Sequence, residues 1–107
     1  MVIYNVTSNV DDSIHEEWLQ WMKEEHIPQI LSTGKFAKAL MSKVLVEEEM
    51  GGTTYSVQYF AKSREHLDKY YAEDAPELRK HVARFTDKLV SFRTEMEVIG
   101  EASIQKS

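Results

Sequence analysis

Residues 53–61, TTYSVQYFA, carry the clearest strand pattern of the chain and decide how the rest of the sequence is interpreted. Tyr55, Val57 and Tyr59 alternate with small or polar residues, which is the period of a strand with one buried face. The preceding residues 47–52, EEEMGG, end in two glycines that suit a tight connection. Residues 35–47, KFAKALMSKVLVE, are strand-like toward their β-branched end. We therefore predict a β-hairpin over residues 35–61.

Two further strands are expected at the two ends of the chain. The first residues, MVIYNVTS, place Val2, Tyr4 and Val6 on one side and Ile3 and Asn5 on the other. The sequence 88–100, KLVSFRTEMEVIG, alternates in the same manner. Its two sides are Val90, Phe92, Thr94, Met96 and Val98 against Ser91, Arg93, Glu95 and Glu97.

A first helix is expected between the first strand and the hairpin. In residues 9–22, NVDDSIHEEWLQWM, Ser13 and Glu16 have capping-box spacing, and Ile14, Trp18, Trp21 and Met22 recur at helical intervals. Pro28 has no amide hydrogen and biases the preceding residue away from helical angles. We therefore expect this helix to kink or restart near His26.

A second helical segment follows the hairpin. Ser63 is its predicted cap, while Asp74 and Pro76 predict an interruption followed by a new first turn. The apolar residues of the two parts are Leu67, Tyr70 and Tyr71, then Leu78, Val82 and Phe85.

The order of these elements is β-α-β-β-α-β, an α+β ferredoxin-like arrangement with a four-stranded antiparallel sheet and helices on one face. We expect one domain over residues 1–100 and a loose tail over residues 101–107. The open face of the sheet would mix polar groups with Ile3, Leu40 or Phe60. A half-apolar sheet face indicates an interface, and a second copy of the chain covers it most simply. We therefore predict a homodimer.

Composition excludes several classes of function. The 107 residues are 42% hydrophobic and 29% charged, with a net charge of −5, so binding to nucleic acid or to an anionic membrane surface is not expected. There is no cysteine, which excludes disulfides and thiolate chemistry and fits a cytoplasmic protein. No stretch has the about 20 apolar residues of a membrane span. No histidine pair has helical metal-site spacing, so no metal site is predicted.

The candidate ligand residues come from the helices and from the strands. His26 shares an apolar stripe with Trp18 and Met22 and can lie at a pocket mouth; the alternative is that it binds carbonyls freed by Pro28. His81 is expected on the inner edge of the second helical segment.

Three strand residues add polar groups. Arg93 can clamp a carboxylate, and the favoured alternative is a salt bridge with Glu95 or with a partner chain. Asn5 and Gln58 are expected to share its sheet face. No catalytic residue can be assigned from the sequence.

Five stretches, YNVT, WLQWMKEEHIPQIL, YSVQYF, HVARF and VSFRTEMEVI, together resemble a family of short bacterial proteins known only as a domain of unknown function. The resemblance covers residues 1 to about 100 and implies a dimeric α/β barrel without an established activity. At superfamily level the chain is also similar to antibiotic-biosynthesis monooxygenases and heme-degrading proteins.

The heme branch of that superfamily uses a first-strand asparagine, a third-strand tryptophan and a second-helix histidine. Asn5 and His81 match two of these by residue type, whereas the third strand ends QYFAKS without a tryptophan. The resemblance therefore does not extend to heme degradation, and histidine-ligated heme stays an alternative to a protein without a cofactor.

Three functions remain open from the sequence. The first is a homodimer that binds a small apolar or aromatic molecule between sheet and helices. The second is a cofactor-free or heme-dependent enzyme of monooxygenase type, with His81 as ligand or base and Asn5 as orienting donor. The third is a structural or regulatory dimer. A cavity on the order of 300 Å³ reached by His26 and His81 would favour the first two.

Overall fold

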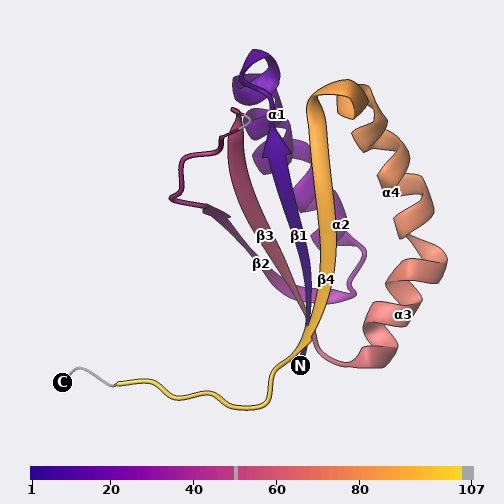
Figure 1. The fold of residues 1–107 in the computed structure, drawn as a ribbon. Helices are drawn as coiled ribbons and strands as arrows, with labels where there is room; N and C mark the ends of the chain where they lie inside the picture. The colour runs from indigo at the N-terminus through magenta and orange to yellow at the C-terminus, as the bar shows by residue number, and fades with distance from the viewer. Residues whose placement is uncertain (50, 105–107) are drawn as a thin grey trace.

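The computed structural model describes residues 1–49 and 51–104, and its elements follow the order β-α-β-β-α-β (Figure 1). The bounds are β1 Val2–Val10, η1 Asp12–Ile14, α1 His15–Trp21, η2 Met22–His26, α2 Ile27–Ser32, β2 Phe36–Lys43, β3 Thr53–Ala61, α3 Arg64–Glu73, α4 Ala75–Val82, η3 Ala83–Lys88 and β4 Leu89–Glu97. The sheet order is β2-β3-β1-β4 with every pair antiparallel. The predicted α+β ferredoxin-like fold is confirmed.

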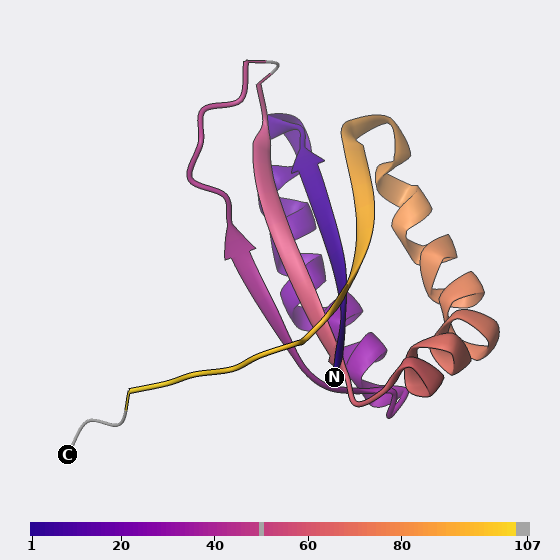
Figure 2. The ribbon, with the colours of Figure 1, turned by 60° about the horizontal axis from the view of Figure 1, so that its bottom comes forward.

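The strand register separates two chemically different faces of the sheet. On β1 and β3, Tyr4 pairs with Tyr59 and Val6 with Val57, and these side chains point toward the helices. On the other face Asn5 pairs with Gln58. The helices cover one face only, as Figure 1 and Figure 2 show. The opposite face is therefore left open.

The first helix begins differently from the sequence prediction. The carboxylate of Asp11 accepts a hydrogen bond from the Ser13 amide at 2.9 Å and another from the Ser13 hydroxyl. The predicted capping box of Ser13 with Glu16 is wrong, because the Ser13 hydroxyl is engaged by Asp11. A short 3₁₀ turn, η1, forms first, and α1 follows it.

Pro28 does not break the first helix. The backbone stays helical from His15 to Ser32 and widens into the π-helical turn η2, where the Ile27 amide donates to the Met22 carbonyl. Pro28 then lies in the first turn of α2, directly after the π-helical turn. The predicted kink near His26 is therefore replaced by a local widening of the helix.

The second helical segment follows its predicted signals. Ser63 caps α3 by accepting from the His66 amide, and Pro76 lies in the first turn of α4. The core between helices and sheet is built around large side chains that are almost fully buried, among them Trp18, Tyr59 and Leu67. None of the described helices is both long and apolar enough to cross a membrane.

The hairpin connection and the C-terminal residues depart from the predicted strand and tail boundaries. β2 ends at Lys43, four residues before the predicted strand end, and Met50 of the connection lies outside the described residues. Residues 98–104 have no regular secondary structure and run away from the sheet (Figures 1 and 2). The loose tail at 101–107 stays a prediction, and its residues 105–107 lie outside the described part.

The two hairpin glycines provide a test of the fold. Gly51 and Gly52 both have positive φ, but only at Gly52 would an added Cβ approach the Val10 carbonyl oxygen, to 2.7 Å. We expect Gly51→Ala to lower the free energy of unfolding by about 1 kcal/mol and Gly52→Ala by clearly more, since the clash is with backbone of β1. Urea titrations measure both losses; equal losses would contradict the packing described.

Candidate functional site

A small cavity of about 50 Å³ lies between the inner face of the sheet and the helices. Its wall is mostly apolar, and both layers contribute to it. The apolar lining includes Trp18, Met22, Ile30, Val57, Leu78 and Val82. The volume is enough for water or a group of a few atoms, and it is below the range of pockets that enclose a whole drug-sized ligand. The cavity is therefore smaller than the volume on the order of 300 Å³ that would favour a ligand-binding function, and His26 lines it without His81.

The π-helical turn explains how one helix lines so much of this cavity. Trp18, Met22, His26 and Ile30 all face inward although they are four residues apart. In a regular α-helix each step of four residues rotates about 40° off a common face. The turn η2 has more residues per turn, so it cancels part of this rotation. His26 therefore stays on the inner side.

His26 is buried without a polar partner. Only 7% of the residue is exposed, its ring stacks on Trp21 with centroids 4.5 Å apart, and it lines the cavity. Its Nδ1 atom has no hydrogen-bond partner within the described residues. The alternative role of binding carbonyls freed by Pro28 is thus not realised, because η2 and α2 absorb the proline without help from the imidazole.

The buried position keeps the imidazole neutral. Burial, with a smaller contribution from the charge of His81, lowers the pKa of His26 from 6.5 to about 4. At neutral pH the ring is therefore uncharged, with one nitrogen able to donate and the other able to accept.

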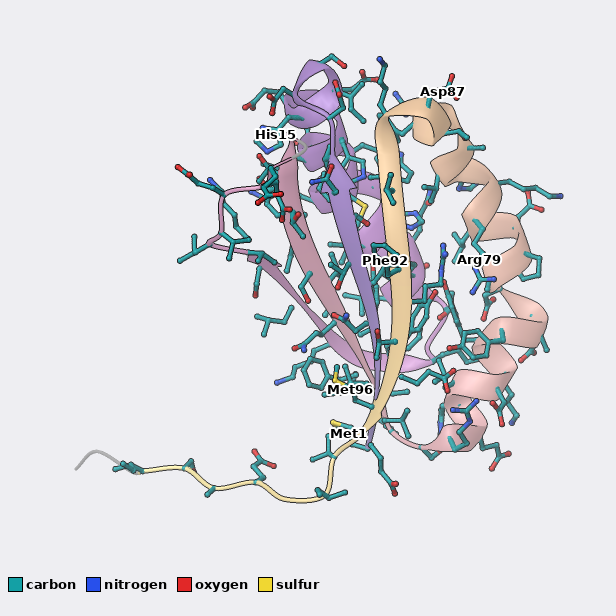
Figure 3. The ribbon with its side chains drawn as sticks, viewed as in Figure 1. Met1, His15, Arg79, Asp87, Phe92 and Met96 are labelled. Atoms are coloured by element: carbon teal, nitrogen blue, oxygen red, sulfur yellow. The ribbon has the colours of Figure 1, made fainter. Side chains whose placement is uncertain are left out.

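Two arginines meet at the edge of the cavity between α4 and β4. Arg93 donates from Nε to the Tyr4 hydroxyl oxygen at 3.0 Å, and Arg79 donates from Nη2 to the same oxygen at 3.4 Å. Figure 3 shows Arg79 between α4 and the sheet. The predicted salt bridge of Arg93 with Glu95 is wrong, because Arg64 engages that carboxylate.

Phenol groups supply the remaining polar lining. Tyr59 and Tyr70 line the cavity beside Tyr4. Burial raises the pKa of both Tyr59 and Tyr70 above the usual range of tyrosine, so both hydroxyls keep their protons. The cavity thus combines neutral donors and acceptors with a cationic edge.

Of the seven predicted ligand residues, the structure brings together Trp18, Met22, His26 and Arg93. Asn5 and Gln58 pair on the opposite, open face of the sheet, so the expectation that they share a face with Arg93 is wrong. The Asn5 amide is also engaged there: its Oδ1 accepts from Ser56 at 2.7 Å and its Nδ2 donates to Thr7 at 3.0 Å.

His81 does not line the cavity. Its side chain is exposed, and the inward positions of α4 are Leu78, Arg79 and Val82. The prediction placed His81 on a face running from Leu78 to Phe85, whereas Leu78, Arg79 and Val82 centre the inward face, and His81 lies about 100° before Val82 around the helix. His81 is therefore turned to the side, although its charge still reaches His26.

Arg79 and the hydroxyl of Tyr4 were not predicted as site groups from the sequence. Arg79 directly follows Leu78 and precedes Val82 by three residues, so helical spacing places it beside the apolar stripe. A charged side chain at such a position is most often solvated. Only the register of β4 shows that Arg93 approaches the Tyr4 hydroxyl oxygen, to which Arg79 also donates.

The residues present do not fit heme. Asn5 lies across the sheet from the cavity, His81 is exposed outside it, and the cavity is far smaller than a macrocycle. Within residues 1–49 and 51–104 no three histidine or carboxylate side chains gather as a metal site. The lining therefore offers hydrogen bonds, apolar contact and positive charge.

The sheet order and the helices on one face define a protein of ferredoxin-like fold. Within this class the chain belongs to the family described as a domain of unknown function, DUF4286, whose model matches residues 1–99. The resemblance inferred from the sequence is confirmed. No curated protein sequence matches the chain significantly.

Solved structures agree with this fold at low sequence identity. A dimeric ferredoxin-like protein from an uncultured marine organism is 16% identical with a TM-score of 0.73, covering 97% of this chain and 100% of its own. SnoaB, a cofactor-independent oxygenase from Streptomyces nogalater, is 10% identical with a TM-score of 0.67 and 94% coverage of each chain.

A third similar structure is a putative antibiotic biosynthesis monooxygenase from Deinococcus radiodurans. It is 12% identical with a TM-score of 0.66 and covers 99% of this chain and 100% of its own. At these identities the likeness shows the fold alone.

The state of His26 predicts a pH dependence of stability. The unfolded chain binds a proton near pH 6.5 that the folded chain takes up only near pH 4, so stability is complete above pH 6.5 and is lost as the pH falls. We expect the free energy of unfolding to fall by roughly 2–3 kcal/mol between pH 7 and pH 4.5. Asp11 and Glu95, whose pKa values are lowered, lose their contributions at lower pH.

The variant His26→Phe tests whether His26 causes the predicted loss of stability at low pH. Phenylalanine keeps the stacking on Trp21 and removes the unpaired nitrogen, so we expect stability at pH 7 to be unchanged or higher. Its pH dependence between 7 and 4.5 should be nearly flat in urea titrations. A variant with the wild-type slope would show that another group is responsible.

Proposed function

We propose that this protein binds a small apolar or aromatic molecule in the cavity between the sheet and the helices. One observation carries the proposal: the Nδ1 atom of His26 is buried in the wall of that cavity without a hydrogen-bond partner. Leaving such a group unpaired costs about 1–3 kcal/mol. A polar atom of a ligand would supply the missing partner, while Trp18 and Met22 would contact its apolar part.

The cavity has one wall that can give way to a ring-sized ligand. α4 has only Ala75 fully buried, and it packs mainly against its chain neighbours α3 and η3. Its inward residues Leu78 and Val82 are half-buried. An outward movement of α4 would enlarge the cavity without disturbing the sheet, and the ligand's apolar surface would then keep Leu78 and Val82 shielded from water.

An enzyme of the cofactor-independent oxygenase type is the second candidate. The position of His26 supports it, since its uncharged imidazole lines the cavity with a ring nitrogen free to accept a hydrogen bond from a bound substrate. One structural neighbour is named as a cofactor-independent oxygenase and another as a putative antibiotic biosynthesis monooxygenase. The roles that the sequence suggested for His81 and Asn5 are not carried into this candidate, because neither side chain lines the cavity.

A thermal-shift screen of small aromatic acids, phenols, flavins and heme tests the binding proposal. A ligand present at about 100 times its dissociation constant should stabilise by roughly 2.7 kcal/mol, or several degrees. We expect the shift to be lost in His26→Phe and kept in His81→Ala, its matched control outside the cavity. A panel without any hit, or a hit that persists in His26→Phe, would favour a structural dimer.

We also propose that the open sheet face binds a second copy of the chain. Phe92 is 67% exposed on this face, with the exposed Val90 before it and Met96 after it along β4, and Leu40 is exposed on the opposite edge strand β2 (Figure 3). In a twofold dimer the second copy would present the same apolar residues, and the two sheet faces would cover each other. Similar solved structures are described as dimeric, which supports this arrangement.

Light scattering tests the dimer. Phe92→Glu places a charge at the centre of the proposed interface, so we expect wild type to have the mass of a dimer at micromolar concentration and this variant the mass of a monomer. Gln29→Glu adds the same charge on the exposed surface of α2 and should leave the dimer intact. A monomeric wild type, or equal behaviour of both variants, would contradict the proposal.

A further inference from the structure

Three hydrogen-bond donors converge at the mouth of the cavity. The guanidinium groups of Arg79 and Arg93 approach the same oxygen atom, the Tyr4 hydroxyl, from α4 and from β4. That hydroxyl accepts from both and donates to no acceptor within the described residues. A single neutral oxygen is therefore the shared acceptor of two guanidinium groups, and the O–H of Tyr4 has no acceptor of its own within the described residues.

No carboxylate neutralises this pair of cations. Within residues 1–49 and 51–104, neither guanidinium lies within 4.0 Å of an acidic side chain, although the chain carries 18 aspartate and glutamate residues. The nearest acid along β4 is Glu95, and its carboxylate is held by Arg64 and by the Tyr71 hydroxyl. Two like charges thus meet beside a cavity in an otherwise acidic protein.

The arginines and the histidine lie at different depths of the same site. Arg79 and Arg93 are exposed, whereas His26 is buried, and all three line the cavity. A molecule that fills the cavity would reach the arginines with its outer end and His26 with its inner end. Guanidinium groups bind carboxylates with paired, charge-assisted hydrogen bonds.

We propose that the ligand is a small carboxylic acid whose carboxylate is held at the mouth by Arg79, Arg93 and the Tyr4 hydroxyl, with its apolar body directed toward Trp18 and Met22. This inference rests on the proposed function, because it uses the same cavity. It adds the chemical class of the ligand and its orientation. The Tyr4 hydroxyl donates to the carboxylate, and the two guanidinium groups turn from the phenol oxygen to the acid.

The test compares benzoate with benzamide, which has the same size and shape but no charge. Ligand-observed NMR titrations give the affinity of each for wild type. We expect benzoate to bind at least tenfold more tightly than benzamide and to lose affinity as salt is added. In a ¹⁵N spectrum the Arg93 Nε–H signal should shift with benzoate and stay in place with benzamide.

Variants locate the effect. Arg79→Gln and Arg93→Gln should each weaken benzoate about tenfold without changing benzamide, and Arg93→Lys should restore part of the loss. Arg84→Gln is the matched control, since Arg84 pairs with Glu17 on the surface and does not line the cavity. Melting temperatures of all variants show whether they are folded.

The two proposals fail in different ways. Equal binding of benzoate and benzamide to wild type would overturn the acid preference and leave the binding site standing. A benzoate preference that survives in Arg79→Gln combined with Arg93→Gln would also overturn it. If neither compound binds wild type at millimolar concentration, both proposals are overturned.

Discussion

The period of two along β1 is the constraint on which the rest of the structure depends. β1 pairs with β3 on one side and with β4 on the other, so the phase of its side chains sets the phase of both neighbours. Tyr4 on the inner face brings Tyr59 and Glu95 to the same face, and Val6 does the same for Arg93. A slip by one residue would turn Phe92 inward and expose the tyrosines. The cavity edge and the open apolar face are therefore two results of a single register.

The helix that covers this face, His15–Ser32, keeps its large side chains toward the sheet because it contains the π-helical turn η2. A regular α-helix could not keep Trp18, Met22, His26 and Ile30 on one side over three successive steps of four residues. The π-helical turn η2 supplies the correction just before Pro28. The same irregularity carries a polar imidazole into an apolar wall, where the fold itself provides no partner for its Nδ1 atom. The unpaired nitrogen lowers the stability of the fold, and the proposed ligand would supply its partner.

The fold could be predicted from the sequence because each strand shows its own alternation and each helix its own stripe. Within the site, Trp18, Met22 and His26 could be placed together because they share a single helix and their spacing shows a common face. Arg93 was also predicted as a ligand residue, but its contact with Tyr4 was not. Asn5 and Gln58 were misplaced relative to Arg93, since alternation within a strand does not reveal which side faces the helices. His81 was misplaced because the inward face of α4 is centred on Leu78, Arg79 and Val82, and the apolar residues alone did not show that Arg79 belongs to it. Arg79 was missed because its importance arises from a contact with β1, 75 residues away.

The ring of Tyr4 gives the mouth of the cavity an unusual stiffness. Four aromatic rings surround it, those of Phe36, Tyr59, Tyr70 and Tyr71, with centroids between 5.6 and 6.4 Å away. The Tyr4 side chain loses its conformational entropy when the chain folds. Binding of a ligand to its hydroxyl therefore involves no further entropy loss from this side chain. The two arginines, by contrast, are long and solvated. The Tyr4 hydroxyl is fixed, whereas the two guanidinium groups can move. Aromatic acids whose carboxylate lies one bond nearer to or farther from the ring would therefore bind the guanidinium groups equally well, but they would differ in their distance to the Tyr4 hydroxyl.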